Sequence, residues 1–227
     1  MAITTSYLDY CYQLARLLYD PVYGGDGVPR GRGEPVLLIP GFFAGDWTLK
    51  VMAGWLSRIG YRPYLSGIDW NIGLPKRTAE LLGWRLTHIL RETQSPVVVV
   101  GHSLGGLLAR FLGVHFPESV RHVVTLGSPI HSPLKALHPF IQLTLSTLRV
   151  LWGPVGDPSA EFTASVSSPL PQQVGFTAIF STADELVDWR TCLDAQEDNR
   201  EVSGQHLGLI VNREVYRILA AVLVASP

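Results

Sequence analysis

A serine between two glycines is the clearest place for chemistry in this sequence. Gly101, Ser103 and Gly105 form the pattern G-x-S-x-G directly after four consecutive valines at 97–100. In this pattern a sharp turn between a buried strand and a helix exposes the serine hydroxyl in a strained backbone conformation. Small residues are needed on both sides because the strand and helix backbones approach closely. The spacing predicts that Ser103 is a nucleophile, against the alternative of a purely structural turn.

A serine hydroxyl needs a general base within hydrogen-bond reach. Of the seven histidines, only His206 lies in a loop between a late strand and the terminal helix, where it could fall back onto the sheet edge that carries Ser103. We therefore predict His206 as the base, with a surface role or His131 as the alternatives. His102 belongs to the turn itself, and we expect its side chain to point elsewhere.

The base in turn needs an acid that orients its ring. Asp184 follows the apolar run 175–181 by a few residues, so it shares the sheet edge where the serine emerges. Asp188 lies one turn further and is the alternative, although it could equally be a surface carboxylate paired with Arg190. We predict Asp184 as the acid because it is nearer the end of the strand; the order serine, acid, histidine is also the one expected for a serine on such a turn between strand and helix.

Two backbone N–H groups are placed to bind the negative charge that develops on an attacked carbonyl oxygen. Leu104 opens the helix after the serine, so its N–H is unpaired and lies at the positive end of the helix dipole. Gly41 follows the apolar run 35–40 and lets the backbone turn outward, which would aim the N–H of Phe42 into the same crevice. We predict that Phe42 and Leu104 form an oxyanion hole, against the alternative of a plain strand-to-helix connection.

Apolar runs alternate with amphipathic stretches along the chain, which predicts an α/β fold. Strands are expected at 35–40, 61–65, 97–100, 120–127, 175–181 and 199–203. Helices are expected at 6–19, 52–59, 78–93 and 104–116, with a last helix capped by Asn212. The first helix is expected to pack on the domain through the stripe Leu8, Cys11, Tyr12, Leu14, Ala15, Leu18 and Tyr19.

Residues 129–172 interrupt this alternation, with seven prolines and one strongly apolar stretch at 140–152. So long an excursion at the carboxyl end of a strand is usually functional. We predict one domain over 1–227 in which 129–172 form a cap over the site; a helix that merely adds to the core is the alternative. The predicted apolar pocket residues are Phe43, Trp47, Ile130 and Trp152.

Composition limits the classes of protein and partner. The chain has 227 residues, of which 47% are hydrophobic and 16% charged, and this disfavours disorder. The net charge is −1 with Lys and Arg dispersed, so nucleic acid is not an expected partner. No apolar run is long enough for a membrane span. The N-terminus lacks a basic start followed by an apolar core, which predicts a cytoplasmic protein, with export left open. Cys11 and Cys192 are far apart, so two buried free thiols are favoured over a disulfide.

Five short motifs, taken together, resemble the α/β-hydrolase superfamily, and in particular its small bacterial lipases and esterases. They are residues 39–43 (IPGFF), 101–106 (GHSLGG), 125–129 (TLGSP), 181–187 (STADELV) and 204–208 (GQHLG). The resemblance implies a reduced, mostly parallel sheet of about six strands with helices on both faces and a helical lid. Many members have His-Gly where this chain has Pro-Gly, and no calcium-ligand pattern surrounds the predicted base. No metal, calcium included, and no cofactor is therefore expected.

The sequence predicts a carboxylic ester hydrolase, lipase or esterase, that forms an acyl-enzyme on esters with an apolar acyl group. An acyltransferase on the same fold is the alternative, because only the acceptor differs from water. A non-catalytic scaffold that binds apolar ligands is a remote alternative. The expected partners are small-molecule or lipid esters, with transient contact to a lipid interface and no obligate protein partner.

Overall fold

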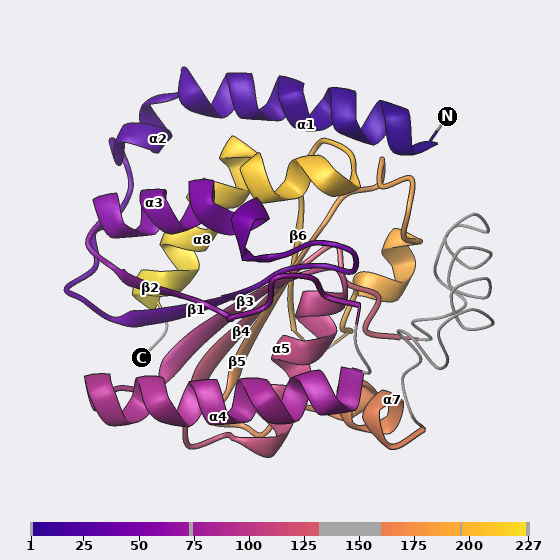
Figure 1. Ribbon diagram of the computed structural model, residues 1–227. Coiled ribbons are helices and arrows are strands. Elements are labelled where there is room, and N and C mark those ends of the chain that lie inside the picture. Colours follow the sequence, from indigo (N-terminus) through magenta and orange to yellow (C-terminus); the bar gives the residue numbers. More distant parts are fainter. Residues whose placement is uncertain (1, 73–74, 132–159, 196, 226–227) are drawn as a thin grey trace.

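The architecture is built on a six-stranded sheet with the order β2-β1-β3-β4-β5-β6, in which every neighbouring pair is parallel. The computed structural model describes residues 2–72, 75–131, 160–195 and 197–225. The strands are β1 (Pro35–Ile39), β2 (Arg62–Leu65), β3 (Val97–His102), β4 (Val120–Leu126), β5 (Gly175–Phe180) and β6 (Asp198–Glu201). Each lies where the sequence predicts a strand, and the sheet runs through the middle of the molecule (Figure 1).

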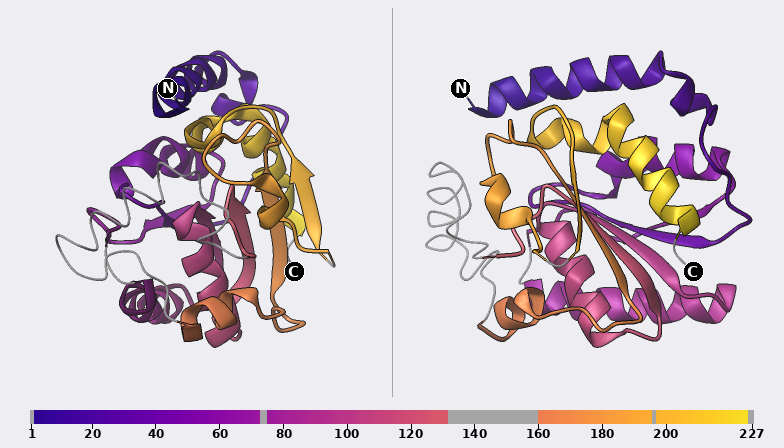
Figure 2. Two further views of the ribbon diagram at one scale, coloured as in Figure 1. Left: turned by 90° about the vertical axis from the view of Figure 1, so that its right-hand side faces the viewer. Right: turned by 180° about the vertical axis from the view of Figure 1, so that it is seen from behind.

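Helices cover both faces of this sheet, which confirms the predicted fold class (Figures 1 and 2). One face carries α1 (Ala2–Leu18), α2 (Pro21–Gly24), α3 (Lys50–Arg58) and α8 (Arg213–Ala225); the other carries α4 (Pro75–Thr93), α5 (Leu104–His115) and α7 (Ala160–Ser167). Three loops contain the 3₁₀ helices η1 (Asp46–Leu49), η2 (Trp189–Cys192) and η3 (His206–Val211). Within the described ranges no helix is both long and apolar enough to cross a membrane.

The valines of β3 show how the sheet fixes the position of the predicted nucleophile. Val98 and Val100 pack in the core on the side of α3 and α8, whereas Val97 and Val99 pack on the side of α4 and α5. Side chains alternate across a strand, so a strand covered on both faces must be apolar at every position. The parallel strands all end at one edge of the sheet, and the elbow at 101–105 follows β3 there.

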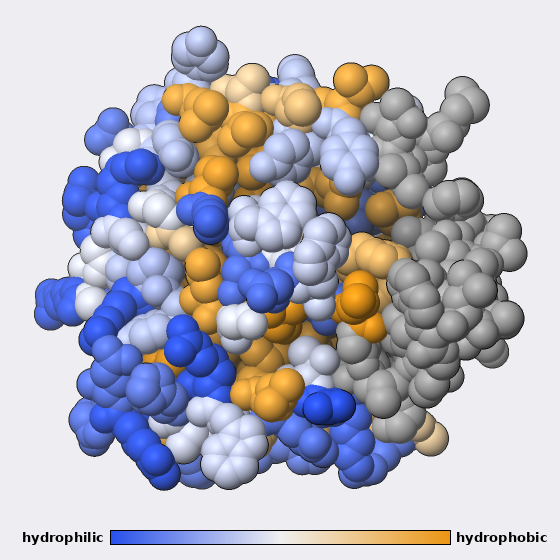
Figure 3. Space-filling view, in the orientation of Figure 1, coloured by the Kyte–Doolittle hydropathy of each residue, from blue (hydrophilic) through white to orange (hydrophobic). Residues whose placement is uncertain are grey.

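The first helix turns a different face to the domain than the sequence predicts. The exposed members of the predicted stripe are Leu8, Cys11, Tyr12, Ala15, Leu18 and Tyr19. Only Leu14 of that stripe is partly buried, and Ser6, Gln13 and Leu17 are buried instead. Apolar side chains accordingly appear along the upper margin of the molecule, where α1 lies (Figure 3). The predicted orientation is wrong because the loop beneath α1 presents backbone N–H groups that need polar partners.

Both cysteines are free, as predicted. Cys192 is buried, and burial raises the pKa of its thiol well above the ordinary range. Cys11 lies on the exposed face of α1, so the expectation that both thiols are buried is wrong for Cys11.

The segment predicted as a cap is described only at its two ends, 129–131 and 160–172. There α7 packs on α5, with the ring of Phe162 stacked 5.5 Å from that of Phe111. Ile130 is fully buried in the same core cluster. These ends therefore belong to the core beneath the sheet. The apolar stretch 140–152, with Trp152, lies outside the described residues, and its role as a cap stays a prediction.

Candidate active site

Ser103 occupies the strained turn that its sequence context predicts. Its backbone has φ of 53° and ψ of −119°, a region that residues other than glycine rarely adopt. A Cβ added to Gly101 would lie 2.1 Å from the carbonyl oxygen of Gly105, and one added to Gly105 would lie 2.2 Å from that of Ile39. The close approach of β1, β3 and α5 thus requires both glycines and leaves the serine at the start of the helix.

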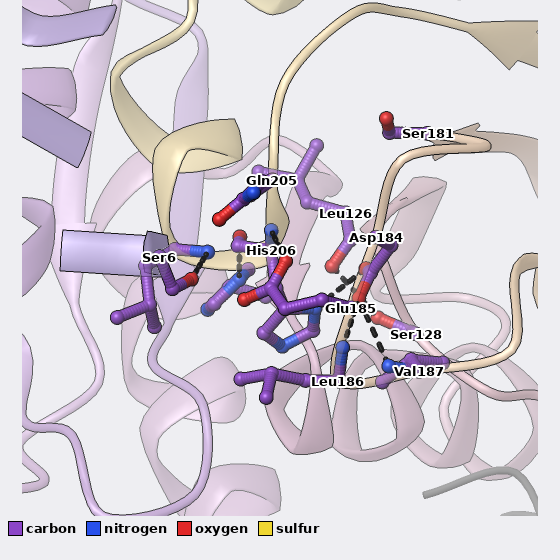
Figure 4. A network of polar contacts seen from close by, with 12 residues as sticks. Ser6, Leu126, Ser128, Ser181, Asp184, Glu185, Leu186, Val187, Gln205 and His206 are labelled. Atoms are coloured by element: carbon purple, nitrogen blue, oxygen red, sulfur yellow. Dashed lines mark hydrogen bonds and ion pairs between the residues drawn. The ribbon is translucent and has the colours of Figure 1, made fainter. Parts of the chain in front are cut away.

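The side chains of His206 and Asp184 meet beyond the carboxyl ends of the strands. Nδ1 of His206 lies 2.6 Å from Oδ2 of Asp184, and the two side chains are 5% and 1% exposed. The other carboxylate oxygen of Asp184 accepts the backbone N–H groups of Leu186 and Val187, each at 2.9 Å (Figure 4). The carboxylate is therefore fixed from two sides, and it fixes the ring that it contacts.

The alternative acid and base lie elsewhere. Asp188 is exposed, caps η2 and pairs with Arg190 at 3.3 Å. His131 is exposed as well. Neither has the buried acid and histidine contact that joins Asp184 to His206.

The electrostatics of this pair suit a general base. Burial disfavours the charged imidazolium of His206, but the adjacent Asp184 carboxylate and its hydrogen bond outweigh burial and raise the pKa of the histidine. Burial likewise disfavours the Asp184 carboxylate, but His206 and the hydrogen bonds from Val187 and Leu186 lower the pKa of the aspartate. The acid therefore stays ionised when the base is neutral, and it stabilises the imidazolium once the base has taken a proton.

The predicted oxyanion donors are the N–H groups of Phe42 and Leu104, and the loop that carries Phe42 is held by hydrogen bonds to Asn71. Among the described residues the backbone N–H groups of Phe42 and Leu104 have no hydrogen-bond acceptor. Phe43 has a positive φ of 56°, and its N–H donates to the carbonyl oxygen of Asn71 at 3.2 Å. The buried side chain of Asn71 in turn donates to the carbonyl oxygen of Pro40 at 2.8 Å. Two unpaired donors on a held backbone are what binding of a developing oxyanion requires.

Parts of this chain are similar in sequence to known proteins. A family described as the PGAP1-like alpha/beta domain matches residues 84–166. Two relatives, each named triacylglycerol lipase and found in Pseudarthrobacter phenanthrenivorans and Burkholderia plantarii, are 30% identical over 104 residues. The matched segment covers 42% of this chain and 33% and 29% of those relatives, so the chain matches about a third of their length.

Several solved structures are similar in fold to this protein over most of its chain. A Bacillus licheniformis lipase in its mature form superposes with a TM-score of 0.65 at 16% identity, over 88% of this chain and 96% of that one. A soluble variant of the monoglyceride lipase from Saccharomyces cerevisiae gives 0.59 at 13% identity, over 86% and 89%. An extracellular alpha/beta-hydrolase from a Paenibacillus species gives 0.55 at 14% identity, over 85% and 98%. The chain has the α/β-hydrolase fold.

One residue of this α/β-hydrolase fold lies in the site against expectation. His102 does not point away: its Nε2 lies 3.1 Å from the backbone oxygen of His206, and the two ring centroids are 4.7 Å apart. Burial, together with the charge of His206, lowers the pKa of His102 to about 3. The ring is therefore neutral and donates its Nε2 proton to that carbonyl oxygen. The sequence carries no signal for this contact, because the partners are 104 residues apart.

The sequence analysis does not predict a role for Asn71 or Glu185. Asn71 has no spacing relation in the sequence to residues 40–43, whose backbone it contacts, so nothing local marks it. Glu185 follows the predicted acid, and its Oε2 accepts the backbone N–H of His206 at 3.2 Å. Its position directly after Asp184 is the signal in the sequence that points to it.

Aromatic side chains border the loop that carries Phe42, a predicted oxyanion donor. Phe43, Trp47 and Trp70 are 39%, 57% and 59% exposed, and the rings of the two tryptophans are 6.4 Å apart. Of the other predicted pocket residues, Ile130 is in the core and Trp152 lies outside the described residues. The pocket assignment therefore stays a prediction, with an exposed aromatic rim beside the site.

Proposed function

We propose that this protein is a serine carboxylic ester hydrolase that acts through an acyl-enzyme. The observation that carries the proposal is the buried pair of His206 and Asp184 at the sheet edge where the strained Ser103 emerges. The similarity to proteins named triacylglycerol lipase supports the same class of reaction.

In the proposed reaction the hydroxyl of Ser103 attacks the ester carbonyl while His206 takes its proton. Asp184 holds the ring in the required tautomer and stabilises the imidazolium. The N–H groups of Phe42 and Leu104 bind the oxyanion, an effect worth about 3 kcal/mol per donor in other enzymes. His206 then gives its proton to the leaving alcohol, and a water molecule activated by the same histidine hydrolyses the acyl-enzyme.

The proposed substrates are esters with an apolar acyl group, lipid esters included. The exposed aromatic rim of Phe43, Trp47 and Trp70 supports this choice, because apolar surface beside a reactive serine favours an acyl chain over a charged group. Two relatives named for triacylglycerol hydrolysis support it as well. Rates on p-nitrophenyl esters of increasing acyl length, and on emulsified triacylglycerol, would establish the preferred chain.

Replacement of the nucleophile tests the reaction. We expect Ser103→Ala to abolish turnover of p-nitrophenyl butyrate and labelling by a fluorophosphonate probe, because the variant has no hydroxyl to acylate. Ser57→Ala is the matched control, since Ser57 is an exposed serine of α3, and it should keep the wild-type rate.

A Ser103→Ala variant that folds and keeps most of its rate would contradict the assignment. An added alcohol separates hydrolysis from acyl transfer: free acid as the main product supports the hydrolase, whereas a new ester as the main product supports an acyltransferase. A wild type that binds esters without turnover or labelling would indicate a binding scaffold.

A further inference from the structure

The polar face of α1 holds the loop that carries the proposed base. Oδ2 of Asp9 accepts the backbone N–H of Gln205 at 2.7 Å, and Oγ of Ser6 accepts the backbone N–H of Leu207 at 3.3 Å. Gln205 and Leu207 are the two neighbours of His206 in the chain. Figure 4 shows Ser6 of α1 reaching this loop from the side opposite Asp184. The N-terminal helix therefore accepts hydrogen bonds from the backbone on both sides of His206.

The loop is shaped to receive the carboxylate of Asp9. A Cβ added to Gly208 would lie 2.2 Å from Oδ2 of Asp9, and one added to Gly204, which has φ of 112°, would lie 3.3 Å from the same atom. The side chain of Gln13 donates to the other oxygen of Asp9 at 3.3 Å and so orients the carboxylate. Glycine on both sides of the loop thus allows an approach that a larger residue would block.

Four hydrogen bonds hold the backbone of residues 205–207, which carries the imidazole. The N–H of His206 donates to Glu185 and its carbonyl oxygen accepts from His102, while Asp9 and Ser6 bind the N–H groups before and after it. The backbone of the base is held at three consecutive residues. This accounts for the burial of Ser6, and of the Gln13 amide nitrogen that donates to Asp9, although an apolar stripe was available on α1, because buried polar groups are retained where they have partners.

We propose that Asp9 is a positioning residue for the hydrolytic reaction: its carboxylate, supported by Ser6, fixes the angle at which His206 faces Asp184 and the nucleophile. The inference rests on the proposed function. Small misplacement of a reacting group can cost about a hundredfold in rate. Asp9→Ala should therefore lower kcat by about tenfold to a hundredfold with little change in KM, because the carboxylate contacts the backbone of the loop that carries the base and none of the groups proposed to contact the substrate.

The variants for the test are Asp9→Ala, Asp9→Asn and Ser6→Ala. Asp9→Asn keeps an acceptor oxygen and should recover most of the lost kcat, and Ser6→Ala should give a smaller loss than Asp9→Ala. Asp26→Ala removes an exposed carboxylate away from the loop and is the matched control. All are assayed with p-nitrophenyl butyrate as full chains, below their unfolding temperatures.

Two further readouts separate positioning from a general loss of stability. In Asp9→Ala the acid limb of the pH profile should move to lower pH, because a displaced ring loses part of its contact with Asp184. Hydrogen exchange at the amides of Gln205 and Leu207 should become faster, with the core strands unchanged. If Asp9→Ala does not fold, Ser6→Ala and Asp9→Asn still report on the same loop.

The proposal would be overturned if Asp9→Ala had the same kcat, pH profile and hydrogen exchange as the wild type. It would also be overturned if Asp26→Ala lost as much kcat as Asp9→Ala. Failure of the proposed function looks different: in that case the wild type itself neither hydrolyses the ester nor reacts with a fluorophosphonate, and the positioning role falls with it. A reactive wild type with an unaffected Asp9→Ala contradicts the positioning role alone.

Discussion

At the scale of single residues, the proposed chemistry depends on which form His206 takes. The ring accepts the proton of Ser103 only when it is neutral, and Asp184 raises its pKa against the opposing effect of burial. Below that pKa the imidazolium has no free lone pair for the proton. We therefore expect kcat/KM to fall as the pH falls through the raised pKa of His206.

Replacement of the acid tests this directly. Asp184→Asn removes the charge that raises the histidine pKa, so the acid limb should move to lower pH. The rate should also fall, by a factor on the order of 10⁴ as in serine proteases, because the amide favours the wrong tautomer. Stopped assays of p-nitrophenyl butyrate hydrolysis across the pH range measure both effects. Asp188→Asn, at the exposed partner of Arg190, should change neither; an unchanged midpoint and rate in Asp184→Asn would contradict the assigned role.

At the scale of elements, the elbow is a contact between three backbones. The glycine at 105 lets the first turn of α5 touch the end of β1, and the resulting geometry sets the strained φ of the serine. Among the described residues the first N–H of α5, that of Leu104, has no acceptor, and it is one of the two proposed oxyanion donors. At this position the packing of β1 against α5 also determines the backbone geometry of Ser103.

Gly105→Ala should lower the free energy of unfolding by at least ~2 kcal/mol, because its methyl group would meet the backbone oxygens of Ile39 and Pro40 rather than a movable side chain. Gly54→Ala is the matched control: the position is inside α3 with nothing within 4 Å of the added carbon, and the change should stabilise by ~0.5 to 1 kcal/mol. Urea unfolding measures both. Equal stability of Gly105→Ala and wild type would show that the elbow can relax.

At the scale of the whole molecule, a buried arginine joins parts that are distant in sequence. The guanidinium of Arg110 in α5 donates to the carbonyl oxygens of Val166 and Ser168 at 2.8 and 2.9 Å and pairs with Asp194 at 3.2 Å. Its side chain is 1% exposed. This one group ties α5 to the end of α7 and to the segment after η2, next to the loop that supplies the proposed acid.

Arg110→Met should lower the free energy of unfolding by ~3 to 5 kcal/mol, because it removes a buried guanidinium that donates to two carbonyl oxygens and pairs with the Asp194 carboxylate. Arg190→Met provides the comparison: its ion pair with Asp188 is mostly exposed, so the loss should stay below ~1 kcal/mol. Chemical denaturation of both variants checks the difference. Similar small losses would show that water replaces the guanidinium at little cost.

The sequence by itself located the six strands, the long helices and the candidate residues of the proposed reaction. Four valines followed by a glycine specify a buried strand and a tight turn through local sterics, and Asn212 caps α8 through its contact with the N–H of Glu214, at 2.8 Å, as predicted. Asp184 and His206 could be named because each follows a strand whose carboxyl end must lie at the same edge.

The tertiary structure alone decided which faces and loops meet. It turned the polar side of α1 inward, where Asp9 meets Gln205 across 196 residues of chain, and it brought His102 onto the carbonyl oxygen of His206. Periodicity reports how apolar a helix face is, but an unpaired backbone N–H on a distant loop has no signature in the sequence around either partner. The requirement to pair such buried groups, which arises only after the chain has folded, chose the polar face over the apolar one.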